Sequence, residues 1–426
     1  MIEKKLRDRI AALIRREVVP AIGCTEPMAV ALAVAKAVEL LGTLPDKIEV
    51  TLSGNMLKNA MGVGIPGTGM TGLPIATALG AIAGNAAYGL EVLRDITPDD
   101  VQKAKEYLNL QPVKISVDHE APSKLYIKVE TVSTKGDSSV TIAGSHTNFI
   151  DMTVDGDKVY SKEFTADSAE GEDDVPLRLK TVWEYATTSP LEELDYLLEA
   201  KRLNLAAALT AMEEGYGHSL GYTMSTTGKK YFGDSIAEHM LAYTSAACDA
   251  RMAGALVPVM SNSGSGNQGI TATMPVVSYA IDCGADEDQT LRALTLSHLT
   301  SIYIKQSLGR LSALCGCVVA STGASAGIVY LMGGGYEEVS AAVKNMVANL
   351  TGMICDGAKP SCAMKISSGV GTALMSAMLA MNGRCVTATE GIVHDDVDET
   401  IHNLTSIGRD AMNEIDRLVL QIMTSK

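Results

Sequence analysis

Residues 111–164 read QPVKISVDHEAPSKLYIKVETVSTKGDSSVTIAGSHTNFIDMTVDGDKVYSKEF, and this stretch decides the fold class. It contains five short runs rich in β-branched and aromatic residues, which are typical of strands. Turn signals separate the runs, among them Lys-Gly-Asp at 135–137 and Asp-Gly-Asp at 155–157. The stretch therefore predicts an antiparallel sheet.

The sequence before this sheet predicts helices and one more strand. Apolar residues recur at helical spacing over 5–19, and an Ala/Val/Leu helix follows over 28–41 after a break at 23–27. Residues 47–53 alternate as a strand does. We expect a mixed α/β N-terminal domain over 1–190.

The sequence after the sheet predicts a second, mostly helical domain over 191–426. The acidic residues at 169–174 (AEGEDD) indicate a solvated loop, and helical patterns continue from Trp183 almost to the end. The predicted fold class is therefore α+β.

Charge and composition exclude several classes of function. The chain has 426 residues, and 35 Lys and Arg against 50 Asp and Glu give a net charge of −15, which repels nucleic acid. Three uncharged segments, at 59–90, 253–281 and 311–336, have the length of a membrane span but are interrupted by Gly, Pro, Asn and Gln. No secretory leader pattern opens the chain. We expect a cytoplasmic protein with no membrane partner.

Eight cysteines in a reducing compartment are poor disulfide candidates and better candidates for thiols or metal ligands. Cys24 follows Gly23 in a turn that leads into the helix at Pro27. Unpaired N–H groups at a helix start can stabilise a thiolate and can hold a substrate carboxylate. Cys24 is thus a candidate catalytic thiolate, with a small buried residue as the alternative.

The C-terminal half supplies further sulfur ligands. LCGC contains Cys315 and Cys317, and CDGAKPSC contains Cys355 and Cys362, while Cys248, Cys283 and Cys385 lie outside these motifs. Thiolates select iron–sulfur clusters or zinc. Three thiolates on a four-iron cluster leave one iron open as a Lewis acid, which is what a β-elimination needs. Buried free cysteines remain the alternative.

Two polar glycine-containing loops offer hydroxyls, amides and backbone N–H groups to a small zwitterion. The candidate substrate-binding residues are Thr25, Ser53, Asn55, Lys58, Asn262, Ser263, Ser265 and Asn267. The second loop lacks the Lys-Ser/Thr of a phosphate-binding loop. His146 is a further possible site residue, although a structural histidine at a strand end is the better interpretation.

The chain resembles the L-cysteine desulfidase family, which is related to bacterial iron–sulfur L-serine dehydratases. The resemblance rests on GCTEP (23–27), SGN (53–55), KNAMGVGIPGTG (58–69), SGSGNQGI (263–270), LCGC (314–317) and CDGAKPSC (355–362). It covers nearly the whole chain. LMGGGYEEV (331–339) followed by NLTGMICD (349–356) is similar to the dehydratases.

The resemblance implies a [4Fe-4S] cluster held by Cys355, Cys362 and either Cys315 or Cys317, with Cys315 preferred. It also implies that the helical domain is the iron–sulfur domain. The dehydratases carry a Ser-Ser-His-Thr type segment where this chain has residues 23–26, which favours the desulfidase branch and Cys24 as its catalytic thiolate. The chain ends in QIMTSK, without the terminal cysteine of some dehydratases.

The function that follows is elimination of sulfide from L-cysteine, with pyruvate and ammonia as the other products. The same mechanism acting on L-serine or another β-substituted amino acid is one alternative. A non-catalytic protein that binds a metal cluster or a small molecule is another. We further expect a homo-oligomer, most simply a dimer.

Overall fold

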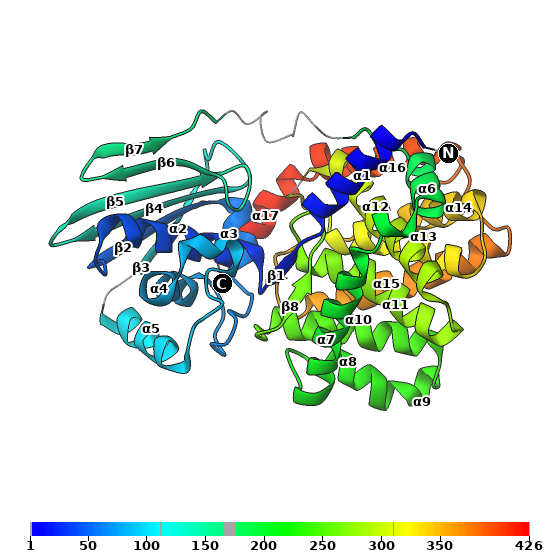
Figure 1. Ribbon diagram of the computed structural model, residues 1–426, viewed down its shortest axis with the longest axis horizontal. Coiled ribbons are helices and arrows are strands. Elements are labelled where there is room, and N and C mark those ends of the chain that lie inside the picture. Colours follow the sequence, from blue (N-terminus) through cyan, green and yellow to red (C-terminus); the bar gives the residue numbers. More distant parts are fainter. Residues whose placement is uncertain (1, 111–112, 165–174, 310, 426) are drawn as a thin grey trace.

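A computed structural model describes residues 2–110, 113–164, 175–309 and 311–425 of the chain. A sheet covered by helices lies on one side of the molecule and a larger helical part on the other (Figure 1). The sheet precedes most of the helical part in sequence, as the α+β prediction requires. The acidic residues 169–174, predicted to form a loop, lie outside the described residues.

The described chain forms a six-stranded sheet in the order β3-β2-β4-β5-β6-β7. Its strands are β2 (Lys47–Ser53), β3 (Val113–Asp118), β4 (Tyr126–Ser133), β5 (Gly136–Ala143), β6 (Phe149–Val154) and β7 (Asp157–Ser161). Every strand predicted from the sequence is present. Pairing from β2 through β4 to β7 is antiparallel, as predicted.

The β2–β3 pair differs from the prediction because it is parallel, with Ile48 opposite Val113. Parallel neighbours need a crossover connection. Here the connection contains α3 (Gly54–Ala60), α4 (Leu73–Ala83), η1 (Ala86–Glu91) and α5 (Pro98–Leu110). The sheet is therefore mixed rather than wholly antiparallel.

Helix α2 (Thr25–Leu41) packs against the sheet through strands β4 and β5 and against α4. Small residues allow this close packing: a Cβ on Gly80 of α4 would lie 2.7 Å from the carbonyl oxygen of Ala31. The sheet and these helices share one buried apolar core. Cys24, at the start of α2, belongs instead to the core of the helical part.

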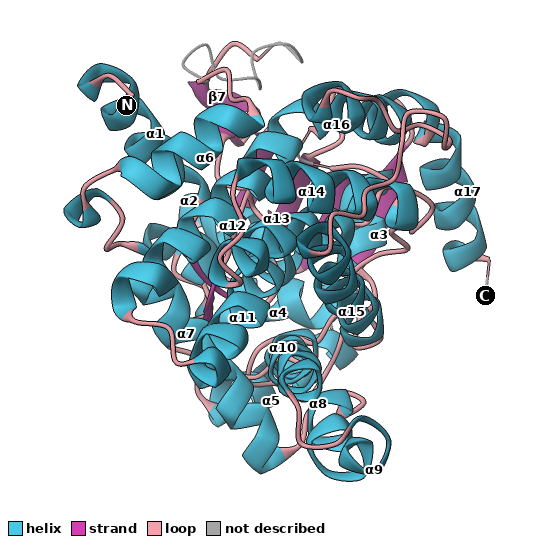
Figure 2. Ribbon diagram, turned by 90° about the vertical axis from the view of Figure 1, so that its right-hand side faces the viewer, coloured by secondary structure: helices cyan, strands magenta, loops and turns pink. Residues whose placement is uncertain are grey.

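The helical part is built around α13 (Gly316–Leu331), which packs against α11, α12, α14 and α15 (Figure 2). The larger helices of this part are α7 (Leu197–Glu214), α10 (Ile236–Met252), α11 (Gly266–Cys283), α12 (Glu287–Leu308), α14 (Tyr336–Leu350) and α15 (Cys362–Met381). The smaller ones are η3 (Leu191–Glu193), α8 (Leu220–Thr223), η4 (Met224–Gly228), α9 (Lys229–Phe232), α16 (Val397–Ser406) and η5 (Ile407–Ala411).

Three helices pack in a part of the molecule other than the one expected from a division at residue 190. Helices α1 (Lys4–Glu17) and α6 (Leu179–Thr188) precede residue 190 but contribute to the core of the helical part. Helix α17 (Asn413–Thr424) contacts α3 near the sheet (Figure 1). A short ribbon pairs β1 (Pro20–Ile22) with β8 (Pro258–Met260). The division of the chain at residue 190 stays a prediction.

The uncharged segments are not single long helices. Residues 253–281 contain β8 and a turn before α11, and residues 311–336 contain a loop before α13. Among the described helices, α15 alone has the length and apolar character of a membrane span, and 44% of its most apolar 18 residues are buried in the protein. A core helix has the same properties.

Candidate functional site

A cavity of about 120 Å³ lies where the N-terminus of α2 meets the helical part. Segments distant in sequence contribute to its wall. The lining residues include Cys24, Thr25, Glu26, Asn59, His146, Arg251, Ser263, Ser265, Asn267, Gln268, Lys305, Cys315, Cys317, Cys355, Cys362 and Lys365. The cavity therefore brings Cys24 together with the candidate metal ligands.

Among the described helices, four begin at the wall of this cavity. Cys24, Ser265 and Cys315 are the N-cap residues of α2, α11 and α13, and Cys362 is the first residue of α15. Unpaired N–H groups and the helix dipole make each N-terminus favourable for anions. Four such ends around one cavity favour a carboxylate and thiolates inside it.

The turn before α2 requires glycine. Gly23 has φ +70°, and a Cβ there would lie 2.5 Å from Cγ of Pro66. Helix α2 begins at Thr25, so Pro27 is its third residue rather than its first, as the sequence had indicated. The prediction that Cys24 lies at a helix start is confirmed.

The carboxylate of Glu26 is the hydrogen-bond acceptor at the centre of this turn. Its Oε2 accepts from Cys24 Sγ and from Thr25 Oγ1, both at 3.0 Å, and its Oε1 accepts from Asn59 Nδ2 at 3.1 Å. Burial alone would raise the pKa of Glu26, but the charge of His146 and the Cys24 hydrogen bond hold this pKa below its ordinary value. Glu26 is therefore ionised at neutral pH.

The same arrangement contradicts the expectation of a thiolate at Cys24. Burial, followed by the negative charge of Glu26, raises the pKa of Cys24 above its ordinary value, and these effects outweigh the positive charge of Arg251. The thiol instead donates a hydrogen bond to Glu26. The sequence pattern had indicated the helix start but not the buried carboxylate beside it.

The candidate metal ligands lie on two segments that pair with each other. Cys355 N donates to Ala313 O at 2.6 Å, and Cys315 N donates to Met353 O at 3.0 Å. The isolated antiparallel bridge between Leu314 and Ile354 places Cys315 and Cys355 on neighbouring segments. Cys362 follows seven residues after Cys355 and begins α15. All three thiols consequently face one cavity.

The electrostatic environment distinguishes these thiols. A hydrogen bond from Cys317 lowers the pKa of Cys315 to about 6, with further lowering by Lys365 and Lys359. Burial raises the pKa of Cys362 to about 11, and the charges of Cys355 and Cys315 add to this increase. Cys315, Cys355 and Cys362 are thus close enough for their charges to interact.

Cys317 and Cys248 are two further thiols of this region. Cys317 Sγ lies 3.0 Å from Lys365 O of α15 as well as close to Cys315. Cys248 is fully buried, and its pKa is raised by burial and by the charges of Cys362 and other neighbours. No role was assigned to Cys248 from the sequence.

The loop before α11 contributes three of its four predicted residues to the cavity. Ser263, Ser265 and Asn267 line it. Asn262 is buried beneath the loop, where its Nδ2 donates to the His298 carbonyl at 3.1 Å. Gln268, which was not predicted, lines the cavity, and its Oε1 accepts no hydrogen bond from the described residues.

Arg251 lines the cavity although the sequence did not assign it to the site, and His146, for which a structural role was preferred, lines it as well. Arg251 is 2% exposed, and it donates to Gly23 O at 3.1 Å and to Asn267 Oδ1 at 2.9 Å. His146 lines the cavity from the turn between β5 and β6. Arg251 lies within α10 and has no motif around it, so no sequence signal could have identified it.

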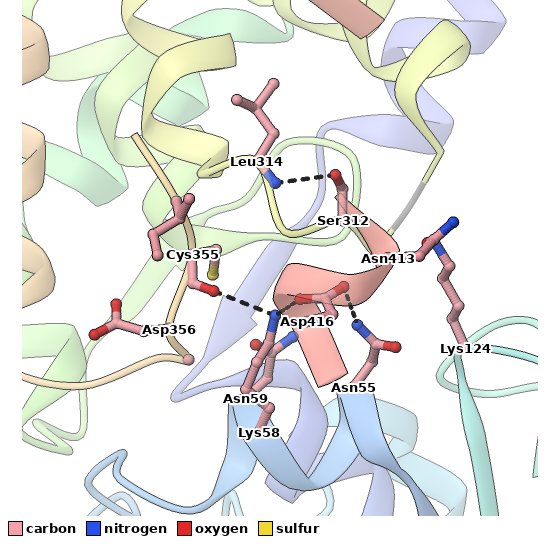
Figure 3. A network of polar contacts seen from close by, with 12 residues as sticks. Asn55, Lys58, Asn59, Lys124, Ser312, Leu314, Cys355, Asp356, Asn413 and Asp416 are labelled. Carbon is pink, nitrogen blue, oxygen red and sulfur yellow. Dashed lines mark hydrogen bonds and ion pairs between the residues drawn. The ribbon is translucent and has the colours of Figure 1, made fainter. Parts of the chain in front are cut away.

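Ser53, Asn55 and Lys58, which were predicted to bind substrate, do not line the cavity. Lys58 Nζ bonds Asp416 Oδ1 at 2.5 Å, and Asn55 Nδ2 donates to Asp416 Oδ2 at 2.9 Å (Figure 3). Ser53 Oγ donates to the carbonyl of Lys124. Asn55 and Lys58 therefore connect α3 to α17. Lys58 Nζ also donates to Cys355 O at 3.4 Å.

The fold and this site define an α+β protein with a buried, thiol-lined cavity. The sequence model described as "Serine dehydratase alpha chain" matches residues 87–421, and the chain belongs to this family. The family consists of lyase-type enzymes that are generally iron–sulfur dependent. The resemblance to iron–sulfur dehydratases is thereby confirmed.

Similar proteins from several bacteria match the chain from end to end. A "UPF0597 protein" of Bacteroides thetaiotaomicron is 58% identical, covering all of this chain and 99% of its own length. Proteins with the same description occur in Porphyromonas gingivalis (53% identical, 99% of both chains) and Shewanella halifaxensis (47% identical, 97% of both chains). These descriptions specify no substrate.

Proposed function

We propose that the protein is an iron–sulfur-dependent lyase that converts L-cysteine and water to pyruvate, ammonia and sulfide. The observation that carries this proposal is one cavity shared by the three candidate ligand thiols, an ionised Glu26 and four helix N-termini. It provides soft metal ligands, a base and an anion-binding surface in one place.

The thiols fit an iron–sulfur cluster. Cys315, Cys355 and Cys362 line the cavity, and Lys359 and Lys365 lower the pKa of Cys315, so nearby positive charge favours anionic sulfur. We assign these three cysteines as the ligands. Cys317 is the weaker candidate because its Sγ already contacts Lys365 O. When bound, the cluster would supply a Lewis-acidic iron that makes the β-substituent a better leaving group.

The amino-acid substrate has complementary groups in the cavity. Its carboxylate fits the N–H groups at the start of α2 and α11 and the buried guanidinium of Arg251. Its ammonium fits the acceptor Oε1 of Gln268. Ser263 and Ser265 add hydroxyls beside these groups. A substrate held at both ends presents its Cα hydrogen to the turn at residues 24–26.

Glu26 is the base in this proposal, and Cys24 is its neighbour. The Glu26 carboxylate takes the Cα proton. The electron pair of the Cα–H bond forms the Cα–Cβ double bond, and hydrosulfide (HS⁻) leaves from Cβ. The resulting aminoacrylate tautomerises and is hydrolysed by water to pyruvate and ammonia. The Cys24 thiol stabilises the ionised carboxylate through its 3.0 Å hydrogen bond.

L-serine is the second candidate substrate, and the match to the serine dehydratase alpha chain family favours it. The reaction is the same elimination: the Cα proton is removed, and water instead of sulfide leaves from Cβ. The serine hydroxyl and cysteine thiol differ by one atom, so the same cavity accommodates both.

The test is anaerobic purification of the protein, followed by an absorption spectrum, an iron count and assays of pyruvate with each substrate. We expect sulfur-to-iron charge-transfer absorption, and a higher kcat/KM for L-cysteine than for L-serine. Cys355→Ser should lose iron and activity together. The matched control is Cys385→Ser, because Cys385 lies outside the cavity. If the wild-type protein contains no iron, the assignment of a cluster is refuted. If L-serine has the higher kcat/KM, only the choice of L-cysteine as the substrate is refuted.

We also propose a cytoplasmic homodimer. The exposed, mostly apolar face of α15 supports this proposal: Met364, Met375, Met378 and Leu379 are each about half exposed. An oxygen-sensitive cluster is best kept in a reducing compartment.

A further inference from the structure

The junction of α9 and α10 contains a group of metal-ligating side chains that lies outside the cavity. Asp234 precedes the N-cap of α10, Glu238 and His239 lie in its first turn, and Asp282 is near the end of α11. One ligand atom from each of Asp234, Glu238 and His239 lies within 4.8 Å of the others. We propose that these three residues bind one divalent transition-metal cation.

The imidazole of His239 is oriented for such a role. Its Nδ1 lies 2.9 Å from Asp282 Oδ2, and its Nε2 lies 3.0 Å from Asp234 Oδ1. A carboxylate on one ring nitrogen fixes the ring so that the other nitrogen can bind a metal. Asp282 is thus a positioning residue, and Nε2 of His239 is the ligand atom.

Glu238 provides the independent observation that a cation belongs here. Its side chain is 0% exposed, yet neither carboxylate oxygen accepts a hydrogen bond from the described residues. Its Oε2 lies 3.6 Å from His239 Nε2, so the carboxylate faces the group. A buried carboxylate without donors is costly unless a cation neutralises it.

Helix capping does not account for the position of Glu238. Ser235 and Glu238 have the spacing of a capping box, in which the glutamate bonds back to the N-cap N–H. Ser235 Oγ does accept from Glu238 N at 3.2 Å, but the described chain lacks the reciprocal bond. The carboxylate is turned toward His239 instead.

The ligand set indicates the class of ion. Two carboxylates and one imidazole are a mixed oxygen and nitrogen set, which suits Mn²⁺, Fe²⁺ or Zn²⁺ better than Ca²⁺. His239 is 29% exposed and Asp234 is 70% exposed, so the site is open to solvent and to water ligands. Lys229, 2.7 Å from Asp234 Oδ1, would move away when the cation binds.

The site would act as a clip between α10 and α11. At their opposite ends, these helices supply Arg251 and Asn267, which bond each other in the cavity. A cation bound by Asp234, Glu238 and His239 fixes the start of α10, and the 2.9 Å hydrogen bond between His239 and Asp282 connects it to the far end of α11. Binding to the folded state alone raises the melting temperature.

The experiment titrates MnCl₂ into the cluster-containing protein and measures free Mn²⁺ by its electron paramagnetic resonance signal. Mn²⁺ is the probe because thiols bind it weakly, so the cavity does not compete. We expect one Mn²⁺ per chain, released by Zn²⁺, and a higher melting temperature. Glu238→Gln and His239→Gln should each weaken binding at least tenfold. Glu287→Gln, in the first turn of α12, is the matched control and should bind as wild type does.

Folding of the variants is checked without Mn²⁺. Because Glu238→Gln removes a buried carboxylate charge that accepts no hydrogen bond from the described residues, its melting temperature in the absence of Mn²⁺ should equal or exceed that of wild type. Failure of wild type to bind millimolar Mn²⁺, or equal binding by wild type and both site variants, would overturn the proposal.

Discussion

At the scale of the residue, Glu26 is the group on which the proposed chemistry depends. We expect Glu26→Gln to lower kcat by about 10²- to 10⁴-fold, because an amide cannot accept the Cα proton. Pyruvate formation measures the loss, and the iron content should stay at the wild-type value. Near-normal turnover by this variant would remove Glu26 from the mechanism.

Cys24→Ala separates the role of the thiol from that of the carboxylate. The Cys24 hydrogen bond lowers the pKa of Glu26, so its loss should move the acid limb of the kcat/KM profile to higher pH. Activity at alkaline pH should fall much less than in Glu26→Gln. An unchanged acid limb would contradict the assignment of Cys24 as the partner of Glu26.

Asp249 gives a prediction about stability and pH. Burial raises the pKa of its carboxyl from 3.8 to about 6, although its Oδ2 accepts from Gly221 N at 3.0 Å. The native state therefore binds a proton more tightly than the unfolded state, and stability falls as pH rises from about 4 to 6. By linkage, the ionised group destabilises the native state above pH 6 by about 3 kcal/mol.

Asp249→Asn removes this penalty and keeps an acceptor for Gly221. Denaturant unfolding at pH 8 should show the variant to be more stable than wild type, and the difference should shrink toward pH 4. A variant that is less stable at pH 8 would show that the carboxylate has a compensating cation in solution.

The sequence identified residue types better than their surroundings. Gly23 and Pro27 marked the turn, so Cys24 could be placed at a helix start. The raised pKa of Cys24 could not be predicted, because it depends on burial and on Glu26, whose neighbour His146 lies 120 positions away. Lys58 was predicted to bind substrate because it follows the polar loop at 53–55, and its ion pair with Asp416 was missed because Asp416 is distant in sequence.

At the scale of the element, α17 is fixed to α3 by one buried ion pair. Lys58 is 1% exposed and bonds Asp416 as well as Cys355 O. We expect Asp416→Ala to lower the free energy of unfolding by about 3–5 kcal/mol, since it leaves a buried ammonium without its carboxylate. Denaturant unfolding measures this change.

The double variant Lys58→Met with Asp416→Leu is the control for this prediction. It removes both charges and keeps apolar volume, so most of the lost stability should return. If the double variant were as unstable as Asp416→Ala, packing of α17 rather than the ion pair would be responsible.

Local patterns predicted most strands and helices because the spacing of apolar residues within a short run indicates the type of element. Residues 47–53 and 149–154 match β2 and β6 residue for residue. The parallel pairing of β2 with β3 was missed because it depends on the crossover through α3, α4 and α5, which no period in the strands encodes.

At the scale of the whole molecule, the cavity exists only where the two parts meet. Thr25 Oγ1 lies 3.1 Å from Gly264 O, and Arg251 Nε donates to Gly23 O at 3.1 Å, so the α2 turn contacts the helical part from both sides. Family resemblance identified Cys24 and the candidate cluster cysteines, but it did not identify Glu26, Gln268 or Arg251 as residues of the cavity. It could not give their assembly, because that depends on packing between distant segments.

The exposed face of α15 leads to a prediction about assembly. Met364, Met375, Met378 and Leu379 recur at helical spacing on this face, and Ser368 and Gly371 between them are small enough for a second helix to approach closely. A contiguous apolar surface of this kind marks an interaction site in a soluble protein. A second copy of the chain can cover it by pairing α15 with α15 about a twofold axis.

We therefore expect light scattering to give the mass of a dimer, and Met375→Glu to give the mass of a monomer because two charges would face each other across the axis. The matched control is Leu209→Glu, which places the same charge on an apolar residue of α7 that is 46% exposed, and this variant should remain dimeric. Since Cys362 begins α15, the iron content of the monomer also tests whether pairing supports the cluster. If the wild-type protein is a monomer, the proposed dimer does not exist. If Met375→Glu remains a dimer, the interface lies elsewhere than on α15.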